Sequence, residues 1–346
     1  MSLSKQRLTR KQSTMVTQLA IDTTSTKYML SGDSGGDVCL FDLDLFRTDV
    51  ETINRAIKRV SFRFNKIGHK TLITSLQWYP IDNGLFISSS RDQTVKIWDT
   101  NKFEPVLSYK YKYSIPCVVM PRVGPFKHKL IGVCSNTSIS FIDLYTGDHI
   151  HEYDTGSPTL TCDFNPINEN EVCVGNSNGY VFFYDIRSNS EKSLIRSLNN
   201  HTTDTSAQMP IYASPVMSVR YTQDGLFLIT VSQKGEIKIW DNTTGKIVPL
   251  YIASHNSWEG GYIQLDTYGY CGNNYLFYPD GNKGTISIYS LDTGKLMNCL
   301  SGHLDAVTCC AFRPDFNELY SGSRDGNILR YEYNNQLIEE EDVWED

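Results

Sequence analysis

Short apolar segments that end in an acidic or polar residue recur along the whole chain. The copies are Leu40-Phe41-Asp42, Ile97-Trp98-Asp99, Phe141-Ile142-Asp143, Phe183-Tyr184-Asp185, Ile239-Trp240-Asp241, Ile288-Tyr289-Ser290 and Arg330-Tyr331-Glu332. Their last residues are separated by 57, 44, 42, 56, 49 and 42 positions. Most copies follow a turn that contains Gly, Asn or Asp, as the second strand of a tight hairpin does. The pattern predicts seven strand-turn-strand units.

A period of this length resembles the WD40 repeat, which forms one four-stranded blade in about 40 to 45 residues. A blade cannot bury both faces alone, so its neighbours must stack around a closed ring. The resemblance implies an all-β fold, a seven-bladed WD40 β-propeller over residues 16–333. The two longest intervals carry insertions. The last blade needs one more strand, and we expect residues 1–15 to supply it.

Two repeats carry the hydrogen-bonding residues that are typical of the WD40 family. They are His69, Ser88 (with Ser90 as an alternative), Asp92 and Trp98 in the second repeat, and His303, Asp325 and Tyr331 in the seventh. Ser, His and Asp also form catalytic triads, but a buried carboxylate held by an imidazole and turn amides is the structural interpretation. The sequence has no GxSxG, HExxH or P-loop motif. We expect structural networks here and no enzyme activity.

The insertions and the two ends of the chain carry separate predictions. Capping-box spacing predicts a short helix over about 49–56, and alternation predicts an outer strand over Arg59–Phe64. The Ser-, Asn- and Thr-rich stretch from Ser188 to Pro215 is typical of a surface loop. Residues 45–66 carry a net charge of +4, which either protects a sheet edge or contacts an acidic or nucleic-acid partner. We expect the acidic tail, residues 334–346, to be disordered.

Composition narrows the functional classes. The formal net charge of -7 provides no basic field, so direct nucleic-acid binding is not expected. The cysteines are scattered without a CxxC pair, which favours reduced core residues over metal ligands or disulfides and an intracellular compartment. No signal peptide or apolar run of about 18 residues occurs, so no membrane association is expected. No cofactor or metal is expected either.

Several stretches resemble one WD40 family in particular, the Cockayne syndrome group A proteins and their fungal relatives. The resemblance is carried by Tyr28 to Gly32 (YMLSG), Gln77 to Pro80 (QWYP), Ser88 to Asn101 (SSSRDQTVKIWDTN), Asp224 to Leu226 (DGL), Cys309-Cys310 with Phe312, and Glu318 to Leu329 (ELYSGSRDGNIL). It implies a substrate-recognition subunit of a cullin-4-type RING ubiquitin ligase, acting in transcription-coupled nucleotide-excision repair in the nucleus. Stalled transcription and repair proteins would be its other partners.

Such receptors dock on a propeller-built DNA-damage-binding adaptor through a box that ends in Trp-Asp-x-Arg. The fourth repeat ends in Tyr184-Asp185-Ile186-Arg187, and it alone of the seven has Arg two positions after the acidic residue. Tyr184 stands in place of Trp, and Asn178 stands where the box usually has an acid. The resemblance implies adaptor binding by these four residues. The alternatives are an Arg187 that bonds only to its own blade, and a nuclear WD40 scaffold with no ubiquitin ligase role.

Overall fold

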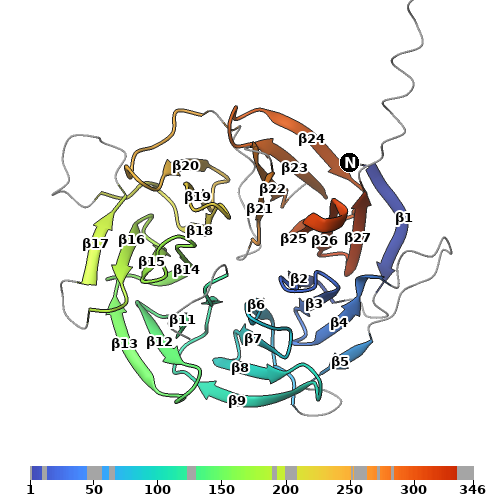
Figure 1. The fold of residues 1–346 in the computed structure, drawn as a ribbon, viewed down its shortest axis with the longest axis horizontal. Helices are drawn as coiled ribbons and strands as arrows, with labels where there is room; N and C mark the ends of the chain where they lie inside the picture. Colours follow the sequence, from blue (N-terminus) through green and yellow to red (C-terminus); the bar gives the residue numbers. More distant parts are fainter. Residues whose placement is uncertain are drawn as a thin grey trace, which may run out of the picture.

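The computed structural model describes residues 2–9, 14–44, 57–61, 67–122, 130–188, 193–198, 209–250, 252, 263–270, 273–281 and 284–332. Its strands form seven antiparallel sheets, which stand side by side around a central axis (Figure 1). The predicted seven-bladed β-propeller is confirmed. The described residues contain no α-helix. None of their helical segments has the length and apolar character that crossing a membrane requires.

Each blade takes its strands in chain order, from the axis outward. Blade 1 contains β2 (Val16–Ile21), β3 (Tyr28–Asp33), β4 (Val38–Asp42) and β5 (Lys58–Val60). Blade 2 contains β6 (Ile73–Trp78), β7 (Leu85–Ser90), β8 (Thr94–Asp99) and β9 (Glu104–Lys110). Blade 3 contains β10 (Cys117–Val119), β11 (Leu130–Ser135), β12 (Ser138–Asp143) and β13 (His149–Asp154). Blade 4 contains β14 (Thr159–Phe164), β15 (Glu171–Asn176), β16 (Val181–Asp185) and β17 (Leu194–Ser197).

The remaining blades follow the same order until the last. Blade 5 contains β18 (Val216–Tyr221), β19 (Phe227–Ser232) and β20 (Ile237–Asp241). Beyond β20, Val248 N donates to Ile239 O at 2.8 Å, which begins an outer edge. Blade 6 contains β21 (Asp266–Tyr270), β22 (Asn273–Pro279), β23 (Thr285–Ser290) and β24 (Leu296–Ser301). Blade 7 contains β25 (Val307–Arg313), β26 (Glu318–Ser323) and β27 (Asn327–Glu332), with the 3-10 turn Pro314–Phe316 between the first two.

The outer strand of blade 7 comes from the other end of the chain. β1 (Ser2–Thr9) pairs antiparallel with β27, with Leu3 opposite Tyr331 and Leu8 opposite Ile328. The N-terminal segment therefore completes the blade that the C-terminal repeat begins. Sequence-distant parts of the chain are joined in one ladder, which closes the ring (Figure 1).

Apolar clusters fill the interfaces between neighbouring blades, one cluster for each of the seven interfaces in the described part of the chain. Between blades 1 and 2, Leu30 packs with Phe86 and Trp98, whose rings stack at 5.5 Å. Between blades 7 and 1, Tyr320 packs with Leu19. Full burial of one such side chain contributes about 1.5 to 3 kcal/mol. Each interface contains several such side chains, so closing the last interface between blades 7 and 1 adds to the stability of the ring.

Hydroxyl and amide side chains on the inner strands join consecutive blades. Thr17 Oγ1 donates to Ile73 O at 2.8 Å, and Thr74 Oγ1 donates to Ile115 O at 2.6 Å. Thr308 Oγ1 donates to Val16 O at 2.6 Å, across the junction of blades 7 and 1. Because these groups are buried, each hydrogen bond is costly to leave unmade. These hydrogen bonds fix the position of each inner strand, along the axis of the ring, relative to the inner strand of the next blade.

The structure corrects the prediction for the second insertion and describes part of the first. The stretch from Ser188 to Pro215 is not only a surface loop, because it contains β17 and the buried residues Leu198, Ile211 and Tyr212. β16 needs an outer partner, and the interface between blades 4 and 5 needs apolar filling. The predicted strand Arg59–Phe64 overlaps β5, which begins at Lys58, and residues 62–66 lie outside the described residues. The helix expected over 49–56 and the tail 334–346 also lie outside them.

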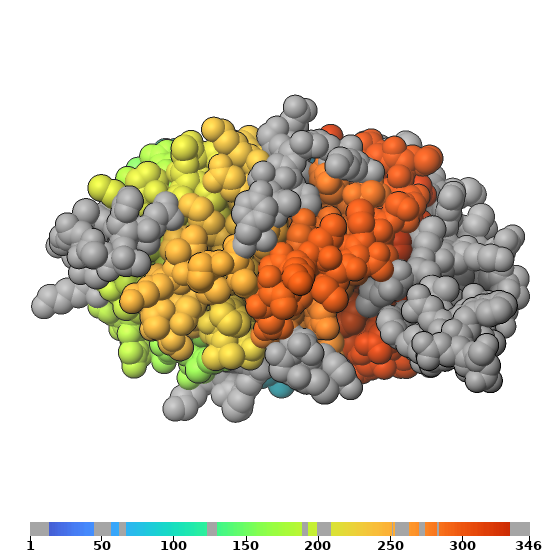
Figure 2. Space-filling view, turned by 90° about the horizontal axis from the view of Figure 1, so that it is seen from above, coloured from blue at the N-terminus to red at the C-terminus, as the bar shows by residue number. Residues whose placement is uncertain are grey.

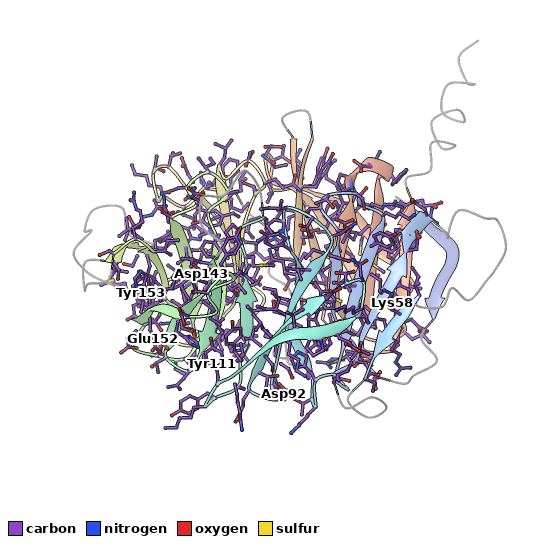
Figure 3. All side chains as sticks on the ribbon, turned by 60° about the horizontal axis from the view of Figure 1, so that its bottom comes forward. Lys58, Asp92, Tyr111, Asp143, Glu152 and Tyr153 are labelled. Atoms are coloured by element: carbon purple, nitrogen blue, oxygen red, sulfur yellow. The ribbon has the colours of Figure 1, made fainter. Side chains whose placement is uncertain are left out.

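The antiparallel blades give the disc two faces. One face carries the connections from the first to the second strand and from the third to the fourth strand of each blade, such as the turns at 165–170 and 185–188. We call it the AB/CD face. The BC/DA face carries the other connections, such as the turn at 91–93. Asp143 and Asp92 lie on these two opposite faces (Figure 3). Seen from its edge, the disc shows blades 5 and 6 side by side in gold and orange (Figure 2).

We predict that removal of residues 2–9 lowers the melting temperature by about 5 °C or more, equivalent to at least about 2 kcal/mol. The deletion unpairs the outer edge of β27 and leaves blade 7 incomplete. Differential scanning calorimetry measures the effect. Removal of residues 339–346, an equal length at the other end, serves as the control and is expected to shift the melting temperature by about 1 °C at most. An unchanged melting temperature after removal of 2–9 contradicts the role of β1 in closure.

Candidate functional site

The predicted network of blade 2 lies at the BC/DA end of the blade. His69 Nε2 lies 2.7 Å from Ser88 Oγ, and His69 Nδ1 lies 3.1 Å from Asp92 Oδ2. Trp98 Nε1 donates to Ser88 Oγ at 2.7 Å, and Lys70 N donates to Asp92 Oδ2 at 2.9 Å. Since Ser88 Oγ accepts from Trp98, its proton is directed to His69 Nε2, which leaves the proton on Nδ1 to Asp92. The chain of bonds joins β7, β8, the turn between them and the connection that precedes β6.

Electrostatics support a neutral His69 beside an ionised Asp92. Burial lowers the pKa of His69 below its ordinary value, although Asp92 opposes this. Burial by itself raises the pKa of Asp92, but hydrogen bonds from His69, Thr94 Oγ1 and Lys70 N hold it well below its ordinary value. His69 and Ser88 are both fully buried. The group is enclosed within the blade, where a substrate has no access, so the arrangement stabilises the fold.

Blade 7 repeats the network with one replacement. His303 Nε2 lies 2.7 Å from Ser321 Oγ, and His303 Nδ1 lies 3.2 Å from Asp325 Oδ2. Tyr331 takes the place of the Trp of blade 2; it is fully buried, and burial raises the pKa of its hydroxyl to about 12. Asp325 also accepts from the backbone of the turn, from Asn327 N at 2.8 Å.

Blade 5 contains a related network that sequence reasoning missed. Thr230 Oγ1 accepts from Trp240 Nε1 at 2.9 Å and lies 2.9 Å from Tyr212 Oη. Tyr212 thus takes the place of the histidine, and the ammonium of Lys238 lies 4.6 Å from the centroid of its ring. The only local signal was the apolar pair Ile211-Tyr212 within a polar stretch. Tyr212 takes the position of the histidine through its hydrogen bond with Thr230, which lies 18 positions away in the sequence.

The four residues of the predicted adaptor box lie at the end of β16 on the AB/CD face of blade 4. Tyr184 and Ile186 are buried, Asp185 is partly exposed, and the side chain of Arg187 is 68% exposed. Tyr184 stacks on Tyr153 of blade 3 at 5.2 Å. The structure therefore brings only Arg187 and part of Asp185 to the surface. Tyr184 and Ile186 instead pack in the interior and hold the segment in place.

Asp185 and Arg187 form a pair through two parallel contacts. Arg187 Nε donates to Asp185 Oδ1 at 2.9 Å, and Arg187 Nη2 donates to Asp185 Oδ2 at 2.6 Å. Hydrogen bonding to Arg187 lowers the pKa of Asp185, and the same contact raises the pKa of Arg187. The planar fork of Arg187 is thus held in one orientation while it stays exposed.

Neighbouring elements hold the turn that follows β16. Tyr153 Oη donates to Asp185 O at 3.1 Å and to Ser188 O at 2.6 Å. Ile186 N donates to Asn170 O at 2.9 Å, which joins this turn to the one between β14 and β15. Tyr153 lies on the outer strand of blade 3 (Figure 3). The turn is therefore fixed by two blades.

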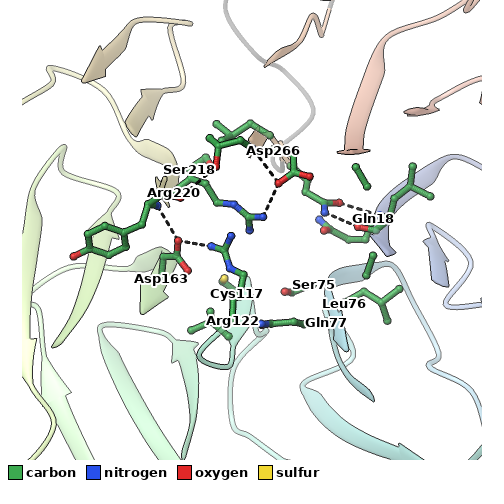
Figure 4. Close-up of a pocket in the computed structure, with 18 of the residues that line it drawn as sticks. Gln18, Ser75, Leu76, Gln77, Cys117, Arg122, Asp163, Ser218, Arg220 and Asp266 are labelled. Carbon is green, nitrogen blue, oxygen red and sulfur yellow. Dashed lines mark hydrogen bonds and ion pairs between the residues drawn. The ribbon is translucent and has the colours of Figure 1, made fainter. Parts of the chain in front are cut away.

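A channel of about 550 Å³ runs along the axis, lined by the inner strands (Figure 4). Two ion pairs face it: Arg122 with Asp163, and Arg220 with Asp266, the latter at 2.8 Å. Asp163 Oδ2 also accepts from Tyr221 N at 3.0 Å, and Asp266 Oδ2 accepts from Phe312 N at 2.9 Å. Both carboxylates are thus engaged in joining blades. Among the described residues, no group of three or more His, Cys, Asp or Glu is arranged to hold a metal.

Comparison with known proteins agrees with this architecture. The sequence matches the family described as WD domain, G-beta repeat over residues 61–99, 192–241 and 294–331, which fall in blades 2, 4 to 5, and 6 to 7. The chain therefore contains WD40 repeats.

Two relatives are similar over much of the chain. The WD repeat-containing protein ATCSA-1 of Arabidopsis thaliana is 22% identical, and the match covers 96% of the chain and 90% of the relative. Radiation-sensitive protein 28 of Saccharomyces cerevisiae is 27% identical over 72% of the chain, which corresponds to 54% of the relative. The chain thus spans about half the length of that yeast relative. Pre-mRNA-processing factor 17 of the same yeast is 24% identical over 54% of the chain.

Replacement of Asp92 with alanine is expected to lower the free energy of unfolding by about 1 to 3 kcal/mol, because His69 and the Lys70 amide lose a buried acceptor. Urea unfolding at pH 7 measures the change. Asp148→Ala removes an exposed acid and is the matched control, expected to change stability by about 0.5 kcal/mol or less. Equal losses in both variants contradict the network.

The same network predicts loss of stability in acid. The pKa of His69 is lowered in the folded state, so the unfolded chain binds a proton first as pH falls below about 6.5. The depressed pKa of Asp92 extends the loss below about pH 3.9. His69 alone contributes a slope that approaches about 1.4 kcal/mol per pH unit. In unfolding series from pH 7 to 5, His69→Gln should show a shallower slope than the unsubstituted chain, and equal slopes contradict a neutral buried His69.

Proposed function

We propose that this chain is the substrate-recognition subunit of a cullin-4-type RING ubiquitin ligase that acts in transcription-coupled nucleotide-excision repair. The observation that carries the proposal is the exposed Arg187 at the end of the fourth repeat, on a chain similar to ATCSA-1 along nearly its whole length. The similarity to Radiation-sensitive protein 28 supports a role in the response to DNA damage. The proposed compartment is the nucleus.

Docking would use the AB/CD face of blade 4. Arg187 is exposed, held in one orientation by Asp185, and set on a turn fixed by Tyr153. An arginine that is already ordered loses little side-chain entropy on binding, and arginine is frequent among residues that dominate interfaces. The partner in this account is the propeller-built DNA-damage-binding adaptor. Tyr184 and Ile186 would hold the turn in position through their buried packing and would not touch the partner.

The substrate would bind elsewhere on the disc. With the adaptor on the AB/CD face of blade 4, the BC/DA face and the rest of the circumference stay open to stalled transcription and repair proteins. The net charge of -7 argues against a DNA-binding propeller, so recognition would be through protein surfaces. The chain itself would perform no chemistry and would position the substrate for the ligase.

A second candidate is a nuclear WD40 scaffold with no ligase role. The similarity to Pre-mRNA-processing factor 17 favours it, since that match covers 54% of the chain at comparable identity. In that case the bond between Arg187 and Asp185 serves only to cap the turn. The two functions differ in whether a ligase component associates through Arg187.

We predict that affinity purification of the full chain from cells recovers the cullin adaptor, and that Arg187→Glu lowers its recovery at least about tenfold, equivalent to about 1.4 kcal/mol. Reversing the charge removes the guanidinium and places a carboxylate beside Asp185. Quantitative mass spectrometry of the bound proteins measures the change.

Lys102→Glu is the matched control, since Lys102 is an exposed cation on the same face after the third strand of blade 2. This variant should retain full recovery of the adaptor. Melting curves of both variants should match that of the unsubstituted chain, because both side chains lie at the surface. Absence of every ligase component from the purified unsubstituted chain sinks the receptor proposal and leaves the scaffold.

A further inference from the structure

Two cysteine thiols face each other across a blade interface at the wall of the channel. Cys117 lies on β10 of blade 3 and Cys162 on β14 of blade 4, and their Sγ atoms are 3.9 Å apart. Cys134 of β11 lies opposite Cys117 in the ladder of blade 3 and packs in the same cluster as Cys162. All three are free thiols.

Of these three cysteines, Cys117 is the most exposed. Cys117 and Cys162 both line the channel of about 550 Å³, and Cys117 is labelled on its wall in Figure 4. Cys117 is partly exposed, whereas Cys134 and Cys162 are buried. A small molecule that enters the channel therefore meets Cys117 first.

The surroundings favour Cys117 as the reactive thiolate. Its hydrogen bond with Cys162, helped by Ser75, lowers the pKa of Cys117 below its ordinary value despite burial. Burial raises the pKa of Cys134 and raises that of Cys162 strongly. The thiolate is the form that reacts with peroxides, and susceptibility follows thiolate character and access.

We propose that Cys117 and Cys162 form a peroxide-sensitive dithiol that closes to a disulfide between blades 3 and 4. The Cys117 thiolate attacks the terminal oxygen of a hydroperoxide, so an S–O bond forms and the O–O bond breaks. The released alkoxide, or hydroxide from hydrogen peroxide, takes up a proton. Cys162 sulfur then attacks the Cys117 sulfenic acid, the S–O bond breaks, and hydroxide leaves as water with the proton of Cys162. Both sulfurs are oxidised and one peroxide is reduced.

Closure requires only a small local movement. A disulfide needs an S–S distance of about 2.05 Å, so the two sulfurs must approach by about 2 Å. The new bond ties β10 to β14 directly, next to Asp163, whose carboxylate pairs with Arg122. In a reducing compartment the dithiol is the resting state, and the disulfide forms under oxidative stress. The bond would lock one blade interface without altering either face.

The test is oxidation of the purified full chain by hydrogen peroxide, followed by alkylation of remaining thiols, digestion and mass spectrometry. We expect a disulfide-linked pair of peptides that contain Cys117 and Cys162, which dithiothreitol releases. Because the bond restricts the unfolded chain, the oxidised protein should melt about 3 to 6 °C higher than the reduced protein.

Variants separate this bond from other oxidation. Cys117→Ser should abolish both the linked peptides and the rise in melting temperature, while Cys299→Ser, which removes an exposed and distant thiol, should leave both unchanged. The peptide analysis of the unsubstituted chain tests the proposal even if a variant folds poorly. A Cys117–Cys134 link, sulfinic acid at Cys117 without any link, or no oxidation of Cys117 would each overturn the proposal.

Discussion

The structure depends on closure of the ring, because no blade can bury both of its faces alone. Each of the seven interfaces has its own apolar cluster in the described part of the chain. The junction of blades 7 and 1 is made by residues far apart in the sequence, such as Thr308 and Val16, which are 292 positions apart. The ladder of β1 with β27 completes blade 7 at this junction. An ion network adds to it, since the buried Arg313 bonds both to the buried Glu318 of its own blade and to the exposed Asp44 of blade 1. Local strand formation and global closure therefore stabilise each other.

Closure also explains how a surface turn can present one arginine in a fixed geometry. The turn after β16 is held by Tyr153 from blade 3 and by Asn170 from its own blade, so its position follows from the packing of two blades. Arg187 is then oriented by Asp185. Preorganisation of this kind lowers the entropic cost of binding, which is the physical basis of the proposed adaptor contact. Tyr184 contributes to this packing, because it is buried and stacks on Tyr153 of blade 3.

The sequence was sufficient for the fold, because the signals of strands and turns are local. All seven recurring segments are the ends of third strands, from β4 to β27, where alternation and tight turns coincide. The rest depends on partners far apart in the chain. Tyr212 acquires its role only through Thr230, the strand β17 is hidden among Ser and Asn residues, and the pair Arg122 with Asp163 has no local pattern. Likewise, the sequence placed Tyr184 and Ile186 in the candidate site, but only packing shows that they lie beneath it.

The most direct test of the central claim is hydrogen–deuterium exchange of the full chain, alone and with the purified DNA-damage-binding adaptor. We predict slower exchange of backbone amides in the turns at 167–170 and 186–188, which lie together on the AB/CD face of blade 4. Turns of the opposite face, at 91–93 and 324–326, should exchange at unchanged rates. Protection confined to the BC/DA face, or no protection at saturating adaptor, would contradict the claim that the closed propeller presents Arg187 as the docking contact.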